Sequence, residues 1–194
     1  MSNEKKLELE LDVMIDTETL AIDPKAAIVQ IGLAYRLPGN AYVHTKEICI
    51  KPSGYEGARN FIIDASTVKW HSQDPTRAAN IERCELEGSS VEVAAFILAD
   101  ILASLSNEGQ HKLMLWSCGT DFDFPILANL YKSQGQIQPW RYGNIRDYRT
   151  MRELFKVEVP MNSKGDHTAV ADAVAQYEHL KEIRKYINRT EGVW

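Results

Sequence analysis

Two acidic side chains near the start of the sequence are spaced so that one cation could bind both of them. Asp16 and Glu18 follow residues 7–15, a segment that alternates between apolar and polar side chains. If that strand continues, the two carboxylates share a face and lie about 6.6 Å apart along it, at about 3.3 Å per residue. Such a pair at the mouth of a sheet can bind a hard cation from one side. On this tripeptide alone, two solvated acids at a strand end are the better explanation, because Asp-x-Glu is common.

A third carboxylate, Asp123, stands where an apolar segment changes into a helical one. Residues 112–116 predict a short buried strand, a loop of small residues follows, and Pro125 could occupy the first position of the next helix. At such a corner a carboxylate can face a site instead of solvent, and Asp121 is a competitor two residues earlier. Asp123 could equally cap the helix, which would need no metal. This segment alone leaves the cap and the ligand open.

His167 and Asp172 form the third group, at the start of the last predicted helix. His167 ends a loop that includes residues 162–165, and Asp172 lies within the helix among alanine and valine side chains. On one continuous helix, five residues would separate the two side chains by about 140°, so they can approach one site only if His167 precedes the helix. A lone histidine at a helix start is more often a cap or a surface group than a catalyst. A carboxylate in an apolar helical turn is costly unless it is paired or binds a metal.

The elements that must position these residues begin with three predicted strands. Residues 7–15, 27–35 and 42–50 are apolar or alternating, and Pro24 and a turn at residues 37–40 separate them. An antiparallel meander is the simplest arrangement of three such strands.

Helices and one further strand follow the predicted meander. Residues 52–88 are polar and weakly periodic, and they predict an insertion over one end of the sheet. The clearest helix starts with a capping box at Ser89 and Glu92 and stops at Gly109. The expected helices are residues 65–71, 89–107, 124–133, 148–155 with Asp147 as N-cap, and 168–188. Early strands followed by alternating strands and helices predict a mixed α/β sheet.

The composition fits one compact domain spanning residues 1–194. The chain is 44% apolar and 25% charged, and it contains neither a membrane-spanning apolar run nor a signal peptide at its start. Its net charge of −5 argues against a broad basic surface for nucleic acid, although a metal-binding acidic cluster would itself raise the negative count. Cys49, Cys84 and Cys118 form neither a disulfide framework nor a zinc pattern, which predicts a cytoplasmic location.

The three acidic motifs, taken in order, resemble those of the DEDD superfamily of 3′→5′ exonucleases, in its His-containing branch. The motifs are Asp16-x-Glu18, Phe122-Asp123 and His167-x4-Asp172, and the resemblance covers about residues 9–175. The flanking sequence is most similar to small bacterial and phage exonucleases, in the manner of exodeoxyribonuclease VIII and the adenylate-specific exoribonucleases. The segments that carry this similarity are residues 27–32, Trp70 with Gln73, residues 124–127 and residues 146–150.

One segment departs from the wider family pattern. Many relatives carry an asparagine a few residues before the aspartate of the second motif, where this chain has Ser117-Cys118-Gly119. In the relatives that asparagine would order the loop and touch substrate. The departure therefore concerns substrate contacts and not metal binding.

The resemblance implies a ribonuclease H-like fold, with a catalytic core at about residues 9–180 and a mixed central sheet flanked by helices. It implies that four carboxylates hold two Mg²⁺ or Mn²⁺ ions and that His167 takes a proton from the attacking water, since imidazole titrates near neutral pH. The expected reaction releases nucleoside 5′-monophosphates from the 3′ end of single-stranded RNA or DNA. The four carboxylates are those of Asp16, Glu18, Asp123 and Asp172.

Candidate substrate contacts lie beside these motifs. Thr19 and Leu20 could wedge against the last base or sugar, and Trp70 and Phe122 could stack on bases. Packing of Trp70 within its own helix is an equal alternative. For Trp116, inside a predicted buried strand, core packing is the expected role. Members of the family often dimerise, so a homodimer is expected, although no interface is visible in the sequence.

Two other classes of protein compete with an exonuclease. A catalytically silent nucleic-acid-binding or protein-binding domain could keep the fold and lose the chemistry, but all four acidic positions and His167 are filled. A phosphatase or other metallohydrolase of small molecules is disfavoured, because the three exonuclease motifs are present and a histidine-rich ligand set is absent. Metal-dependent release of mononucleotides from an oligonucleotide would separate the three classes.

Overall fold

A five-stranded sheet forms the centre of the computed structural model, which describes residues 9–106, 110–158 and 167–190. The strand order is β3-β2-β1-β4-β5. The strands are β1 (Leu9–Thr19), β2 (Ile28–Tyr35), β3 (His44–Cys49), β4 (His111–Ser117) and β5 (Ile145–Asp147). β1, β2 and β3 form an antiparallel meander, whereas β4 and β5 run parallel to β1. The predicted mixed sheet and meander are therefore confirmed.

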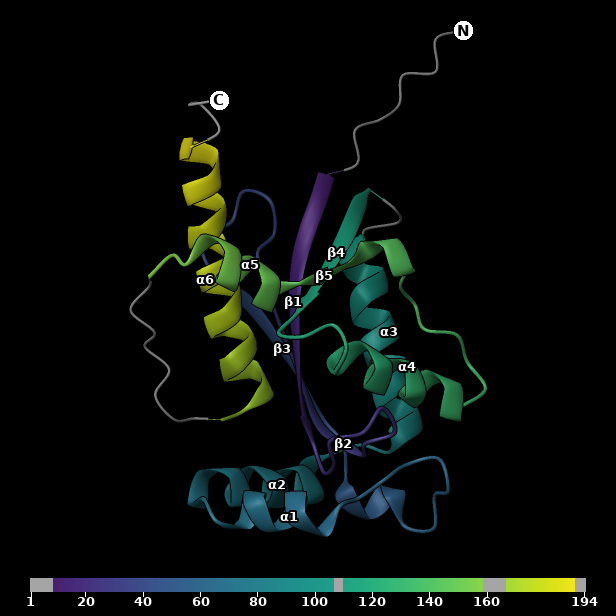
Figure 1. Cartoon of the computed structure of the whole chain (residues 1–194). Helices are drawn as coiled ribbons and strands as arrows, with labels where there is room; N and C mark the ends of the chain where they lie inside the picture. Colours follow the sequence, from purple (N-terminus) through teal and green to yellow (C-terminus); the bar gives the residue numbers. More distant parts are fainter. Residues whose placement is uncertain (1–8, 107–109, 159–166, 191–194) are drawn as a thin grey trace, which may run out of the picture.

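Helices cover both faces of the sheet and one of its ends (Figure 1). They are η1 (Pro52–Tyr55), α1 (Ala65–Ser72), α2 (Pro75–Glu87), α3 (Val91–Ser106), α4 (Asp123–Ser133), η2 (Tyr142–Asn144), α5 (Tyr148–Phe155) and α6 (Ala169–Thr190). α3 and α4 pack in one apolar cluster, and α5 and α6 pack in another on the opposite face. α1 and α2 lie across the end of the sheet. Among the described residues, no helix combines the length and the apolar character that crossing a membrane requires.

The alternation of β1 decides which side chains meet which helix. Val13 and Ile15 are fully buried in the cluster that contains α3 and α4, and Met14 is buried against α6. Side chains two positions further along a strand return to the same face. The face of Met14 is therefore also the face of Asp16 and Glu18, so both acids point toward α6.

β1 runs through to Thr19, so the first motif lies at the end of this strand as expected, while residues 7 and 8 fall outside the described part. Two other local expectations need correction. Leu9, expected on the buried face, is 59% exposed. The carbonyl of Ser90, not Ser89, accepts the first backbone bond of α3, and Ser89 instead bridges to Ile50 of the sheet. The predicted stop at Gly109 also falls outside the described residues.

The insertion between β3 and α3 is more regular than expected. Besides α1, it contains α2, whose start carries an Asp74 N-cap and Pro75 in the first turn. Both are standard helix-start signals, and they define this helix even though the segment is polar and weakly periodic. The expected α5 and its Asp147 cap are confirmed.

Candidate active site

Three carboxylates from two elements meet at the face of β1 that is covered by α6. Asp16 and Glu18 come from β1, and Asp172 comes from the first turn of α6. One carboxylate oxygen of each lies within 4.8 Å of the others. One cation could therefore contact all three side chains. The structure brings acids of the first and third motifs together, as the resemblance implied.

Asp123 stands beside this cluster, on the first residue of α4. It is 3% exposed, and its Oδ1 accepts a hydrogen bond from the Thr17 hydroxyl at 2.7 Å. Phe122 occupies the N-cap position of α4, and no side chain caps that helix end. The alternative that Asp123 caps the helix is therefore wrong, as is the expectation that Pro125 starts the helix, since Pro125 is its third residue. The competitor Asp121 is exposed.

Burial and mutual repulsion raise the pKa values of these acids. The pKa of Asp16 lies well above its ordinary range, first because of burial and next because of the negative charge of Asp123. Burial, followed by the charge of Asp172, raises the pKa of Glu18 to about 7, while the Arg77 guanidinium lowers it. Burial raises the pKa of Asp123 to about 6 against the hydrogen bond from Thr17. Such crowding is unfavourable for a metal-free protein and is relieved by a bound cation.

Gln176 supports one of the carboxylates and was not foreseen from the sequence. Its side-chain nitrogen donates to Oδ1 of Asp16 at 2.8 Å. It lies four residues after Asp172, so both side chains project from one face of α6. Within the described ranges the Gln176 Oε1 is buried without a hydrogen-bond partner. A buried acceptor beside a carboxylate cluster is suited to a water molecule on a metal ion.

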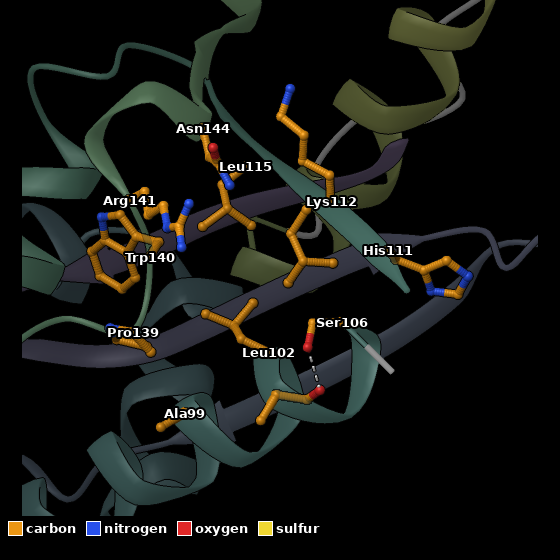
Figure 2. Close-up of a pocket in the computed structure, with 12 residues that line it drawn as sticks. Ala99, Leu102, Ser106, His111, Lys112, Leu115, Pro139, Trp140, Arg141 and Asn144 are labelled. Carbon is orange, nitrogen blue, oxygen red and sulfur yellow. Dashed lines mark hydrogen bonds between the residues drawn. The ribbon is translucent and has the colours of Figure 1, made fainter. Parts of the chain in front are cut away.

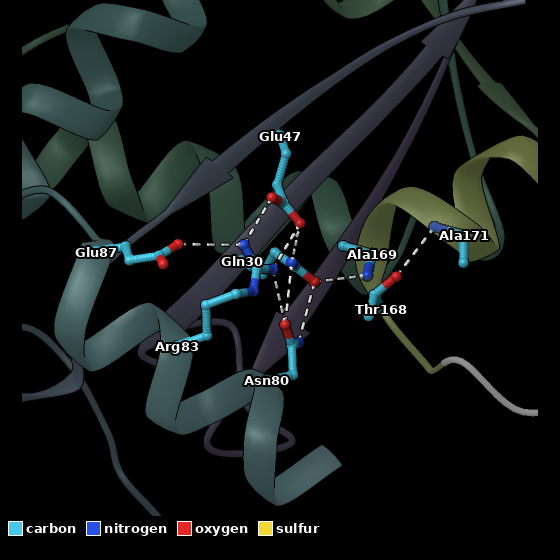
Figure 3. Close-up of polar contacts among 8 residues, drawn as sticks. All are labelled: Gln30, Glu47, Asn80, Arg83, Glu87, Thr168, Ala169 and Ala171. Carbon is cyan, nitrogen blue, oxygen red and sulfur yellow. Dashed lines mark hydrogen bonds and ion pairs between the residues drawn. The ribbon is translucent and has the colours of Figure 1, made fainter. Parts of the chain in front are cut away.

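Two residues of β2 hold the start of α6 against the sheet. Gly32 pairs with Asp16 across the strands, and a Cβ added to Gly32 would lie 2.2 Å from the carbonyl carbon of Ala169. Gln30 pairs with Glu18, and its Oε1 accepts a hydrogen bond from the Ala169 N–H at 2.7 Å (Figure 3). The strand positions opposite the two acids of β1 therefore also place the helix that carries the third acid.

A buried polar network fixes the Gln30 side chain itself (Figure 3). Asn80 of α2 donates to Gln30 Oε1 and accepts from its Nε2, each at 3.2 Å. Gln30 Nε2 also donates to Glu47 of β3, which binds Arg83 through two contacts of 2.7 and 2.8 Å. Gln30 is fully buried, so every bond that its amide makes replaces water. A single polar residue within the apolar β2 sequence was the signal that could have identified it.

His167 precedes α6 by two residues. This is the arrangement in which His167 and Asp172 can approach one site. The side chain of His167 is exposed and its φ is 30°, in the left-handed region. Burial raises the pKa of Asp172, and the charge of His167 opposes that rise. Backbone hydrogen bonding first, and the charge of His167 to a smaller extent, lowers the pKa of Asp74 at the start of α2. The imidazole is therefore close enough to both carboxyls for its charge to act on them. Residues 162–165 of the loop before it fall outside the described residues.

The expected substrate contacts differ in their exposure. Trp70 is 47% exposed at the end of α1, and Phe122 is partly buried against the core. Thr19 and Leu20 are 7% and 4% exposed, so only a small part of either side chain could meet a substrate. Trp116 is buried in the α6 cluster, which confirms core packing as its role.

A cavity of about 490 Å³ lies apart from the carboxylates (Figure 2). It is formed by α3, β4 and residues 139–144, and Leu102 and Leu115 in its wall belong to the core on the α3 face. None of the acids of the three motifs lines it. The cavity is therefore separate from the cluster beside α6.

Comparison with known proteins agrees with this geometry. The model of the family described as the 3'-5' exoribonuclease Rv2179c-like domain matches residues 11–184. The exodeoxyribonuclease of Enterobacteria phage T4 is 24% identical over 197 aligned residues, which cover 91% of this chain and 86% of the phage protein.

Among solved structures, the chain is similar to the nuclease domain of 3'hExo, a DEDDh family member bound to rAMP. The TM-score is 0.60 at 9% sequence identity, with 93% of this chain and 94% of that chain covered. At this identity the likeness shows the fold, which is the expected ribonuclease H-like fold. The match of the family model shows more, because it spans all three motifs: the chain belongs to the Rv2179c-like 3′→5′ exoribonuclease domain family and is a 3′→5′ exonuclease.

Proposed function

We propose that this exonuclease removes nucleoside 5′-monophosphates from the 3′ ends of single-stranded nucleic acid and depends on two divalent cations, Mg²⁺ or Mn²⁺. The observation that carries the proposal is the convergence of Asp16, Glu18 and Asp172 within 4.8 Å, with Asp123 close enough for its charge to raise the pKa of Asp16. Carboxylates are the ligands that such hard cations prefer.

The residues present fit a pair of cations. Burial raises the pKa values of Asp16, Glu18 and Asp123, neighbouring negative charges add to the effect at Asp16 and Glu18, and bound positive charge would offset both. The Gln176 Oε1, which has no partner among the described residues, could accept a hydrogen bond from a coordinated water. When bound, two such ions supply an activated water and stabilise the leaving 3′-oxygen. Asp16, Glu18, Asp123 and Asp172 would hold them.

His167 is proposed as the general base. It is exposed, and its charge acts on the Asp172 carboxyl, so a substrate water near the cluster would be within its electrostatic reach. A neutral imidazole nitrogen would accept the proton of the attacking water, and the nearby carboxylates would stabilise the imidazolium that forms. Trp70 and Phe122 are proposed to contact bases, and Thr19 and Leu20 the last nucleotide.

The relatives differ in the sugar of the nucleic acid that their names give. The family is described as exoribonucleases, whereas the phage relative is an exodeoxyribonuclease. We propose single-stranded 3′ ends of RNA or DNA as the substrate class. A homodimer, a cytoplasmic location and a single domain over residues 1–194 also remain proposals; the three free thiols of Cys49, Cys84 and Cys118 support the cytoplasm.

A substrate panel tests the function. Matched RNA and DNA oligonucleotides, single-stranded and double-stranded, are incubated with Mg²⁺ or Mn²⁺, with EDTA as the control, and products are resolved by length. We expect stepwise shortening from the 3′ end, release of 5′-monophosphates and no reaction in EDTA. Tight binding without hydrolysis under every metal condition would instead support the silent binding domain.

A further inference from the structure

Arg77, on α2, is held in a fixed position beside the carboxylate cluster. Its guanidinium carbon lies 3.6 Å from the centre of the Trp70 ring, and its Nη2 donates to the Trp70 carbonyl at 3.1 Å. The Asp74 carboxylate accepts the Arg77 backbone N–H at 3.0 Å, which caps the helix. Stacking on an aromatic ring keeps the guanidinium plane oriented before any ligand arrives.

The positive charge of Arg77 has no carboxylate partner of its own. In the ranges that the structure describes, no acid lies within ion-pair distance of it, and its Nε is buried without a hydrogen-bond partner. Its charge nevertheless acts on two carboxyls: it opposes the rise in the pKa of Glu18 that burial causes, and it adds to the backbone hydrogen bonds that lower the pKa of Asp74. Arg83 on the same helix differs, because Glu47 binds its guanidinium with two contacts.

We infer that the Arg77 guanidinium binds a phosphodiester group of the substrate strand at the edge of the metal site. The inference rests on the proposed function, since it names a contact of that same site. A planar guanidinium matches a phosphate with two parallel hydrogen bonds. The chain carries a net charge of −5, which argues against a broad basic surface for nucleic acid. The fixed guanidinium of Arg77 would therefore attract a phosphodiester at this one place.

Trp70 has two roles in this arrangement. One face of its ring supports Arg77, and the part that remains exposed, 47% of the residue, is open to the sugar or base next to the bound phosphate. A phosphate on Arg77 and a nucleotide against Trp70 would guide the strand along α1 and α2 toward Glu18. This subsite recognises charge and shape and carries no base preference.

The test measures binding in the Asp16→Asn background, where no substrate is consumed. A short fluorescein-labelled oligothymidylate is titrated in Mg²⁺ with and without Arg77→Gln. Loss of a phosphate contact should raise Kd about tenfold. It should also reduce the slope of log Kd against log salt concentration by about 0.7. Arg141→Gln is the charge-matched control, since Arg141 lines the cavity on the α3 side and should leave Kd unchanged.

Methylphosphonate substitution then identifies the partner of Arg77. Each phosphodiester of the oligothymidylate is replaced in turn by the neutral methylphosphonate, and Kd is measured with Arg77, Arg77→Gln and Arg77→Lys. At one linkage the neutral analogue should weaken binding to the Arg77 protein but have no further effect on Arg77→Gln. Arg77→Lys, which keeps the charge, should fall between the two and decides the question if Arg77→Gln does not fold.

An unchanged Kd in Arg77→Gln, or an equal loss of affinity on neutralising any of the linkages, overturns the inference. Arg77 would then only offset the negative charge of the Glu18 carboxylate. Failure of the proposed function has a different signature. In that case the parent protein hydrolyses no oligonucleotide in any metal, whatever Arg77 contributes to Kd.

Discussion

The side-chain oxygen of Gln30 accepts the backbone N–H of Ala169 at 2.7 Å, which ties the strand position opposite Glu18 to the first residue of α6. The first N–H groups of a helix have no partner within the helix, so a buried acceptor at this point fixes where the helix begins. Asp172 follows three residues later. The position of Asp172, the α6 member of the carboxylate cluster, therefore depends on a neutral amide in the middle of β2.

We expect Gln30→Met to destabilise the protein by about 1–3 kcal/mol and to lower kcat. The substitution leaves the N–H of Ala169 and the amide of Asn80 without a buried partner, so α6 and its acid lose their anchor. Urea unfolding measures the stability, and initial rates at saturating Mg²⁺ measure kcat. Gln136→Met, at an exposed position, is the control. A stable Gln30→Met protein with parental kcat would contradict the anchoring role.

The sheet and the helices of this fold were largely predictable because their signals are local. Alternation in β1, the apolar run of β2 and the Asp147 cap of α5 each act within a few residues, and each predicted its element. The polar α2 was missed although its cap was readable. The role of Gln30 could not be predicted from local signals, because its partners Glu47 and Ala169 lie 17 and 139 residues away in sequence.

The acids of the site could be predicted from the sequence where a carboxylate stands in a position that apolar residues normally occupy, or where several acidic motifs occur in order. Asp172 within an apolar turn is costly unless it is paired or binds a metal, whereas the common Asp16-x-Glu18 pair points to metal chemistry only together with the other two motifs. The supports could not be found in this way: Gln176 is an ordinary helix residue, and Arg77 becomes notable only when it stacks on Trp70. Their roles depend on contacts between elements, which residue spacing does not encode.

Asp16→Asn should abolish nuclease activity without lowering stability. The carboxylate is buried among other acids and its pKa is raised, so removing its charge relieves repulsion in the metal-free protein. Thermal unfolding in EDTA should therefore give an equal or higher Tm. Asp12→Asn is the matched control on the same face of β1: it weakens an ion pair with Arg184 but should retain activity. Residual activity within a few fold of the parent would remove Asp16 from the metal site.

Asp123→Ala should inactivate the enzyme, whereas Asp121→Ala should remain substantially active. Asp123 is buried, and its charge is felt by Asp16, while Asp121 is exposed two residues earlier. Initial rates on one oligonucleotide, with Mn²⁺ binding measured by calorimetry, compare the two variants. The reverse ranking of activities would show that the second motif had been assigned to the wrong aspartate.

The metal-free protein should lose stability as pH rises. The pKa values of Glu18 and Asp123 are raised to about 7 and about 6 in the folded state, above the values of about 4.3 and 3.9 expected after unfolding. Between those limits the folded protein binds more protons than the unfolded one, so the free energy of unfolding falls from about pH 4 to pH 7. The two shifts together correspond to a loss on the order of 6 kcal/mol.

Urea unfolding in EDTA across this pH range measures that dependence. The curve should level off above about pH 8, beyond the Glu18 pKa of about 7, because both carboxyls are then ionised in the folded and the unfolded protein. Addition of Mg²⁺ at pH 8 should restore stability by binding the folded state. Asp16→Asn should flatten the profile, since it removes one of the repelling charges. Stability that rises from pH 4 to pH 7 in EDTA would show that the acids are not crowded as described.

His167→Ala should lower kcat by about 10²–10⁴-fold while metal binding changes little. The four carboxylates remain in place, and His167 is exposed, so its removal leaves no cavity. The parental kcat should rise with pH through the range in which imidazole titrates and then level off, because only the neutral ring accepts a proton. The variant should lack that inflection. His111→Ala, which changes a histidine of the cavity on the α3 side, should keep it.

A structural role for His167 makes the opposite prediction. Its φ of 30° just before α6 would suit a residue that only shapes the helix start, in which case the alanine variant would lose some stability but keep kcat and the pH profile. His167→Asn separates the two roles, because asparagine tolerates this backbone conformation and cannot act as the base. An asparagine variant with parental stability and a low, pH-independent kcat supports the base. One with parental kcat and the inflection removes His167 from the reaction.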